Sequence, residues 1–267
     1  MRKNFVIGFF MLTAFSLALS GFVRTGVSHN FTGAQDSAIV ANDLPERDEV
    51  HQSYQLSPGA QVSLSYVNGQ VDVQTVDGDT AYVDIVRSAN NRADFVYDTI
   101  SIDNTPADLV LRGANSKSGR IEVRQRVSLR IPRQSNFTVK QVNGSVNIGP
   151  INGNVNIRGV NGTLKLAQTA GNSDISSING HMTITVSRLG DGGLRIRDAV
   201  SPVELRLADD LNANLIVKKL DGNVSVNSPK VTLNRLSETE YNGQVGSGGP
   251  PISIIDVRGG LRIGRTQ

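Results

Sequence analysis

Apolar and polar residues alternate along much of this chain, and a period of two predicts short β-strands with one buried and one exposed face. Outside the repeat described next, the alternation is sustained in the segments 62–66, 121–131 and 203–207. In the longest segment it is broken only at Gln125. The segment 88–118 is irregular and contains Pro106, so we expect a weak strand pair with loops there.

A nine-residue unit recurs five times between residues 142 and 186. Its pattern is apolar-Asn-Gly-x-apolar-x-apolar, and the fourth copy is degenerate but keeps the glycine. The copies begin at Val142, Ile151, Val160, Thr169 and Ile178. Related units without this fixed spacing occupy 67–73, 220–226 and 257–263. A fixed short period is typical of repeat architectures.

An Asn-Gly pair between apolar residues is also a strong signal for a two-residue hairpin, which would make the region an antiparallel meander. In such a hairpin the flanking residues point to the same face. Here the flanks pair an apolar residue with a polar one, as in Val142 with Ser145 and Ile151 with Asn154. The period-two alternation of apolar residues instead continues through the glycine position. This favours a corner between successive strands over a hairpin.

We therefore expect an all-β fold, namely a β-solenoid similar to a parallel β-helix, and we leave room for a sheet-like N-terminal part. Two units would form a rung of about 18 residues and three units a rung of about 27, and apolar residues of successive rungs would stack into one interior. Glycine, and asparagine in a left-handed conformation, allow the turn at each corner. The expected corner residues are Asn143, Gly144, Asn152, Gly153, Asn161, Gly162, Gly171, Asn179 and Gly180. The loop 246–251 should precede a closing strand that masks the open edge.

The N-terminus has the basic, apolar and small-residue order of a secretory signal, so residues 1–20 are expected to be a signal peptide. The alternative is an uncleaved anchor, since residues 5–23 are just long enough to span a bilayer. Residues 21–52 are expected to be a flexible tether, and 53–267 the repeat domain. Cysteine is absent, so neither disulfides nor thiolate metal sites stabilise this domain.

Three features in chain order resemble a known family. The segment 54–59 (Tyr-Gln-Leu-Ser-Pro-Gly) leads into the first Asn-Gly strand, 129–132 (Leu-Arg-Ile-Pro) follows, and the tandem Asn-Gly-x-Val-x-Ile units come next. This order resembles the bacterial domain-of-unknown-function family labelled "putative adhesin", from about residue 54 to the C-terminus. The resemblance implies an exported β-solenoid or stacked-sheet protein without an established activity, and it brings no functional residues with it.

Candidate catalytic chemistry is sparse, so we expect no catalytic, cofactor or metal site and no cofactor. The three histidines, His29, His51 and His181, form no metal-binding spacing. Carboxylates on predicted outer strand faces could meet across rungs and form the acid pair of a glycoside-cleaving enzyme. These carboxylates are Asp72, Asp84, Asp174 and Glu204. We expect them to be surface residues that aid solubility.

Basic residues form the clearest surface feature. Arg124, Arg126 and Arg130 share the outer face of one predicted strand, where they could bind an acidic partner, although Glu122 lies on the same side. The net charge of +3 includes Arg2 and Lys3 of the signal, so the exported part is nearly neutral and a nucleic-acid partner is not expected. A second polar feature consists of asparagines that could bind sugars or form stabilising ladders, of which we favour ladders: Asn147, Asn154 and Asn156.

These observations predict a non-enzymatic exported scaffold or adhesin-like binding module in the periplasm or on the cell surface. Its expected partner is an envelope glycan or another surface protein, and a membrane only if the N-terminal segment stays uncleaved. One alternative is a carbohydrate-active β-helix enzyme that uses clustered surface carboxylates. The other is a membrane-anchored envelope or signalling accessory protein.

Overall fold

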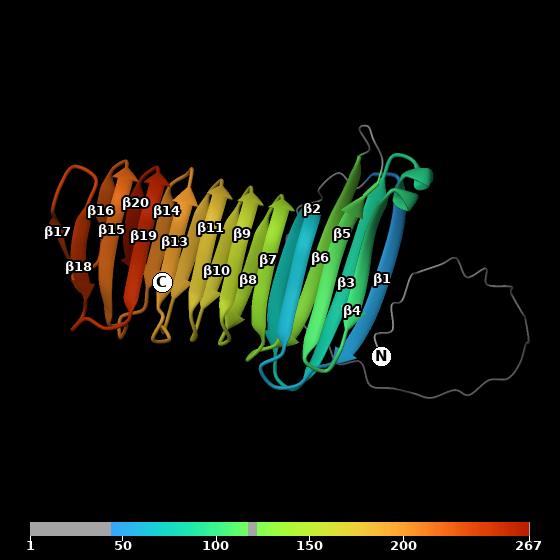
Figure 1. Ribbon diagram of the computed structural model, residues 1–267, viewed down its shortest axis with the longest axis horizontal. Helices are drawn as coiled ribbons and strands as arrows, with labels where there is room; N and C mark the ends of the chain where they lie inside the picture. The colour runs from blue at the N-terminus through green and yellow to red at the C-terminus, as the bar shows by residue number, and fades with distance from the viewer. Residues whose placement is uncertain (1–43, 117–121, 267) are drawn as a thin grey trace, which may run out of the picture.

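The computed structural model describes residues 44–116 and 122–266, and these residues form an all-β fold (Figure 1). The expected signal peptide at 1–20 and most of the expected tether lie outside the described residues. A single turn of 3-10 helix, η1 (Arg92–Val96), interrupts the strands. Among the described residues, no helix combines the length and the hydropathy needed to cross a membrane.

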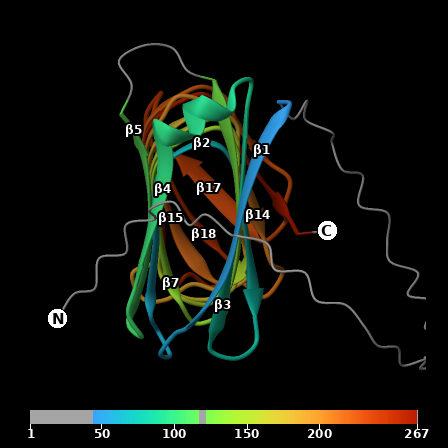
Figure 2. The same cartoon turned by 90° about the vertical axis from the view of Figure 1, so that its right-hand side faces the viewer.

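Two sheets face each other along the whole length of the fold, as the end-on view in Figure 2 shows. In sheet A the strand order is β1–β3–β6–β2–β8–β10–β12–β14–β20–β16. Its strands are β1 (Glu46–Gln55), β3 (Thr80–Ala89), β6 (Val123–Pro132), β8 (Val146–Ile151), β10 (Leu164–Gln168), β12 (Met182–Val186), β14 (Val203–Leu207), β20 (Leu261–Arg265) and β16 (Val224–Val226). The long strand β2 (Gln61–Val76) enters both sheets.

Sheet B has the order β4–β5–β2–β7–β9–β11–β13–β19–β15–β18–β17. Its other strands are β4 (Asp98–Asn104), β5 (Asp108–Asn115), β7 (Asn136–Asn143), β9 (Val155–Asn161), β11 (Ser173–Asn179), β13 (Leu194–Ala199), β19 (Pro251–Arg258), β15 (Ala213–Asp221), β18 (Tyr241–Val245) and β17 (Val231–Arg235). Pairing is parallel through the middle of both sheets and at the β20–β16 end of sheet A, and antiparallel at the other three ends, in β1–β3–β6, β4–β5 and β15–β18–β17.

In the repeat region, the parallel register joins residues that are 18 positions apart. Leu164 pairs with Val146 on one side and with Met182 on the other, so two nine-residue units make one circuit of the two sheets. The inward residues of both sheets form one continuous aliphatic core. Val146 and Ile157 are 0% exposed, as the parity of the repeat predicts. The core extends from β3 and β5 to the C-terminal strands, and it contains a buried polar contact in which the Ser173 hydroxyl donates to the Gln168 side chain.

The Asn-Gly pairs lie where the chain passes between the sheets, not at hairpin tips. β7 pairs with β2 and β9, whereas β8 pairs with β2 and β10, so the strands on either side of Asn143-Gly144 are not paired with each other. Gly144 has φ +152°, and a Cβ there would lie 1.9 Å from the carbonyl oxygen of Gly69. Gly162 and Gly180 repeat this contact in the next two circuits. Glycine is therefore required at these corners for two reasons: other residues rarely adopt this backbone conformation, and there is no space for a Cβ atom.

Each sheet B strand of the parallel region also contains a single residue in the left-handed conformation. This residue lies between two inward residues that are three positions apart, such as Val139 and Val142 around Gln141. The registers place these residues in one column along the sheet: Tyr66, Gln141, Gly159, Ser177, Asp198, Asp256 and Lys219. The extra residue leaves two consecutive side chains outside and bends the strand, as a β-bulge does.

Two expectations about the ends of the domain were wrong. Strand β1 begins at Glu46, so the last part of the range 21–52 is a paired strand and not a flexible tether. The strands that follow the loop 246–251 do not close an edge. β19 lies between β13 and β15, and β20 lies between β14 and β16, so the C-terminal strands fill an interior position of the stack.

Candidate binding surfaces

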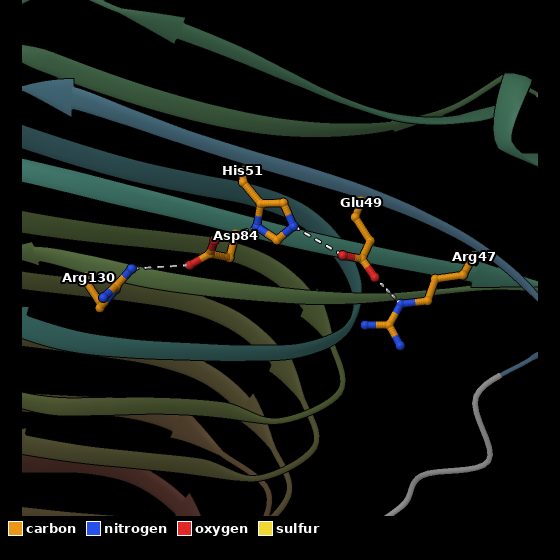
Figure 3. A network of polar contacts seen from close by, with 5 residues as sticks. All are labelled: Arg47, Glu49, His51, Asp84 and Arg130. Carbon is orange, nitrogen blue, oxygen red and sulfur yellow. Dashed lines mark hydrogen bonds and ion pairs between the residues drawn. The ribbon is translucent and has the colours of Figure 1, made fainter. Parts of the chain in front are cut away.

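The predicted basic strand is β6, and its outer face lies next to charged side chains of β1 and β3. Antiparallel pairing sets Tyr82 opposite Arg130 and Ser88 opposite Arg124. The Arg130 guanidinium lies 4.6 Å from the centre of the Tyr82 ring, a cation–π contact. Figure 3 shows the polar network that crosses the three strands through Arg47, Glu49, His51, Asp84 and Arg130.

Most of the positive charge on this strand is balanced. Arg124 forms an ion pair with Glu122 at 2.8 Å, and an Arg130 nitrogen lies 3.8 Å from an Asp84 oxygen. Arg126 is half-buried, and among the described residues it has neither a hydrogen-bond nor an ion-pair partner. The structure therefore places the three arginines on one face, as expected, but leaves only one of them unpaired.

Arg124 and Arg126 line a shallow groove at the corner between the sheets. Gly69 and Gly144 form part of its lining, and a Cβ there would lie 1.8 Å from the Gln125 carbonyl oxygen or 1.9 Å from that of Gly69, so both positions are closely packed. The other residues around the groove are Asn68, Gln70, Val86, Ser88, Gln125 and Ser145. Two glycine corners therefore border this groove beside the basic strand.

His51 lies on the edge strand β1 and is held between two carboxylates. Its Nδ1 is 2.7 Å from Asp84 on β3, and its Nε2 is 3.1 Å from Glu49. The Asp84 contact, followed by the Glu49 contact, raises the pKa of His51 above its ordinary value of 6.5. His51 in turn lowers the pKa of Glu49, with help from Arg47. A protonated His51 therefore links the edge strand to its neighbour.

We expect the contribution of His51 to stability to be fully present below pH 6.5 and to be lost as the pH rises through the raised folded-state pKa. NMR titration of the imidazole should give a pKa above 6.5 in the native chain. Asp84→Asn should move this pKa back toward 6.5, because it removes the strongest contact. Glu204→Gln lies near His181 instead and serves as the control. An unchanged His51 titration in Asp84→Asn would contradict the assignment.

The other two histidines add no site. His29 lies outside the described residues. His181 is exposed, and its ring lies 4.0 Å from Glu204 and 3.3 Å from the Thr183 hydroxyl. Within the described ranges, no group of three or more side chains of the metal-binding types is placed to hold an ion.

The carboxylates considered for catalysis are spread over both sheets and have other partners. Asp72 and Asp84 lie on either side of Ser128 in sheet A. Asp72 accepts hydrogen bonds from Gln70 and Asn147, and Asp84 contacts His51. Of the other two, Asp174 binds Arg197 in sheet B, and a hydrogen bond from Arg206 lowers the pKa of Glu204.

Sequence reasoning did not single out Asp98, which is a buried carboxyl. It is 5% exposed, and burial raises its pKa, against the opposing effects of the Gln125 hydrogen bond and the Arg87 charge. The Gln125 side chain donates to Asp98 and accepts from the backbone N–H of Asn68. The break in alternation at Gln125 is thus the sequence signal of a buried polar contact near one end of the core.

Asparagine side chains form two ladders along the corners. In one ladder, the amide of Asn161 donates to Asn143 at 3.0 Å and that of Asn179 donates to Asn161 at 3.1 Å. In the other, the backbone N–H of Asn154 donates to the side chain of Asn136, and that of Asn172 donates to Asn154. Asn147 instead donates to Asp72, and exposed Asn156 has no hydrogen-bond partner among the described residues.

The outer surface of sheet B carries a second set of polar side chains, which we call the sheet B face. It is formed by Tyr66 on β2, Thr138 and Lys140 on β7, and Asn156 and Arg158 on β9. Tyr66 is 55% exposed although it is a large aromatic residue, and its φ is +59°. A bulky residue rarely adopts the left-handed region, but this φ belongs to the left-handed column described above and is therefore part of the sheet architecture.

Within the described ranges, four of the five side chains of the sheet B face form neither a hydrogen bond nor an ion pair. The fifth, Thr138, accepts a hydrogen bond from the Gln61 side chain. The sequence contained a signal for this face. Leu64 and Val67 are inward residues three positions apart, which leaves Ser65 and Tyr66 as consecutive outward residues. The hydrophobic pattern alone, however, does not show which neighbouring side chains lie beside the ring.

No family model and no curated protein matches this chain. Among solved structures, a "putative cell adhesion protein" from Clostridium sporogenes is similar, with a TM-score of 0.40 and 11% identity, over 82% of this chain and 100% of that one. A "putative adhesin" from Bacteroides fragilis has a TM-score of 0.34 and 11% identity, over 82% and 99%. A "putative lipid binding protein" from Parabacteroides distasonis has a TM-score of 0.24 and 13% identity, over 81% and 96%. These values are too low for a family or a function to follow from them.

Proposed function

We propose that this chain is an exported, non-enzymatic β-solenoid that binds an envelope glycan as an adhesin-like module. Parallel pairing at a spacing of 18 residues and the stacked glycine corners support the solenoid architecture. The basic, apolar and small-residue order at 1–20 supports export. Because the interior is filled with aliphatic side chains, binding takes place on the outer faces of the two sheets.

The sheet B face carries this proposal through one observation, the exposed ring of Tyr66 on the same outer face as unpaired polar side chains. Tyrosine combines an apolar ring with a polar tip and loses little conformational entropy on binding. The Asn156 amide, which is free in this structure, can both donate to and accept from sugar hydroxyls. A rigid strand surface holds both groups in fixed positions, which lowers the entropic cost of binding.

A printed array of bacterial glycans, probed with the full exported chain, tests the proposal. Tyr66→Asn removes the ring but suits the left-handed backbone, because asparagine tolerates that conformation. We expect this variant to lose binding about tenfold or more, the equivalent of one good aromatic contact of about 1.5 kcal/mol. Lys219→Asn, in the same left-handed column but in a distant strand, is the matched control. If no glycan binds, or if Tyr66→Asn binds like the native chain, the proposal is wrong.

The glycine-lined groove beside β6 is a second candidate surface, which the unpaired Arg126 favours. Replacing Arg124 and Arg126 with serine in the same array separates the two surfaces. Loss of binding in this variant, with Tyr66→Asn unaffected, would assign the glycan to the sheet A groove and not to the sheet B face.

A further inference from the structure

We infer that the sheet B face recognises an acidic, linear polysaccharide, whose carboxylate or sulfate groups bind Lys140 and Arg158. This inference rests on the proposed function and specifies the chemical class of its glycan. The inferred site lies on strands of sheet B, whereas the arginines of β6 lie on sheet A. It depends on the arrangement of charged side chains that the strand registers create.

The registers place basic residues side by side in one outward row. Arg112 on β5 is in register with Ser65 on β2, Ser65 with Lys140 on β7, and Lys140 with Arg158 on β9. Adjacent strands lie about 4.8 Å apart. Lys140 and Arg158 are therefore directly neighbouring cations, and Arg112 lies two strands away from Lys140 on the same row. All three are exposed.

No carboxylate in the described part of the chain neutralises this row. Neither β7 nor β9 contains aspartate or glutamate, and the half of β2 that enters sheet B, residues 61–68, contains none. Arg112, Lys140 and Arg158 have no ion-pair partner among the described residues. Like charges directly opposite each other on a sheet are destabilising. An anionic ligand that bridges Lys140 and Arg158 would remove this repulsion.

Acidic residues return on the next strands of the same face and limit the basic area. Asp174 on β11 binds Arg197 through two hydrogen bonds, of 3.0 and 3.1 Å. Asp198 and Asp256 occupy the left-handed column in β13 and β19. On the other side, exposed Asp108 begins β5 and exposed Asp103 lies on the adjoining β4, so the area without carboxylates is a narrow strip over β2, β7 and β9, with Arg112 of β5 at its border. A strip suits a single polymer chain better than the broad surface of an anionic membrane.

Neighbouring groups favour a sugar polymer over other linear polyanions. Tyr66 lies one position after Ser65 on β2, and Thr138 and Asn156 lie on the same outer face, two residues before Lys140 and Arg158. An aromatic ring on the same face as hydroxyl and amide groups matches the apolar faces and hydroxyls of sugar rings. A single tyrosine does not provide the series of aromatic platforms on which successive nucleic-acid bases stack.

Binding of the full chain to immobilised polygalacturonate, compared with its carboxyl-reduced neutral form, tests the inference. We expect measurable binding to the acidic polymer that weakens as sodium chloride is raised, because salt screens exposed charges. Replacing Lys140 and Arg158 with glutamine should weaken this binding about tenfold or more, as expected when two charge-assisted contacts are lost. Removing neighbouring like charges should leave the melting temperature equal or higher, so lost binding cannot be ascribed to unfolding.

The matched control replaces Lys165 and Arg262, exposed cations of sheet A, with glutamine, and should change affinity less than twofold, since exposed charges far from a site are screened. Equal binding of the acidic and neutral polymers would overturn the inference and leave the proposed function intact. Failure of both polymers and of every array glycan would overturn both. Salt-sensitive binding to vesicles of anionic lipid, without binding to polygalacturonate, would replace the polysaccharide with a membrane and also overturn the inference.

Discussion

Gly162→Ala should lower the free energy of unfolding by about 2–6 kcal/mol or prevent folding, since overpacking and backbone strain each cost about 1–3 kcal/mol. An alanine Cβ at this position would lie 2.2 Å from the carbonyl oxygen of Gly144, and the backbone has φ +149°. The chain cannot shift locally, because the Gly180 corner packs just as closely against Gly162 from the next circuit. Urea denaturation followed by far-ultraviolet circular dichroism measures the effect.

Gly264→Ala is the control for this substitution. Gly264 also lies on a strand, β20, but a Cβ there meets no atom within 4 Å. We expect its denaturation midpoint to stay close to that of the native chain, within about 0.5 kcal/mol in stability. Equal midpoints for Gly162→Ala and Gly264→Ala would show that the close approach of the corners does not limit stability.

Leu164→Ala should destabilise the domain by about 2–5 kcal/mol, the usual cost of truncating a fully buried leucine. Leu164 is 0% exposed and lies between Val146 and Met182 in the middle of sheet A. Because backbone ladders hold the strands on both sides, the surroundings cannot collapse fully into the cavity. Equilibrium denaturation in urea gives the difference.

Leu236→Ala makes the same chemical change where the side chain is 61% exposed. We expect it to cost less than about 0.5 kcal/mol. A loss at Leu164 no greater than that at Leu236 would mean that the aliphatic core is not the main source of stability.

Much of the parallel region could be predicted from the sequence, because one physical rule governs each position of its repeat. Inward residues had to be apolar, so the parity of Val146 and Ile157 placed them in the core. The pairing of an apolar with a polar residue around Asn143-Gly144 favoured a corner over a hairpin, and the strand pairing agrees. Pattern alone allowed rungs of 18 or 27 residues, because both keep the same parity, and the registers have 18.

The antiparallel ends and the strand order could not be predicted in the same way. Antiparallel and parallel strands share the same alternation, so the pattern of β1 and β17 does not reveal their partners. For the candidate site, alternation placed Arg124, Arg126 and Arg130 on one face, but it could not show that Asp84 of another strand lies beside Arg130. Lys140 and Arg158 are likewise unremarkable in sequence and become neighbours only through the register.

The position of β19 and β20 inside the stack has a consequence for the order of assembly. β15 and β16 precede β19 and β20 in the chain, yet β19 and β20 are their parallel partners in the two sheets. Until those strands emerge, the segment 213–245 has no docking surface on the circuit formed by β13 and β14. The C-terminal quarter therefore cannot fold progressively behind the growing chain. Because β19 pairs with both β13 and β15, loss of β20 alone would keep this connection, whereas a chain that lacked β19 and β20 would leave the segment 213–245 without its parallel partners.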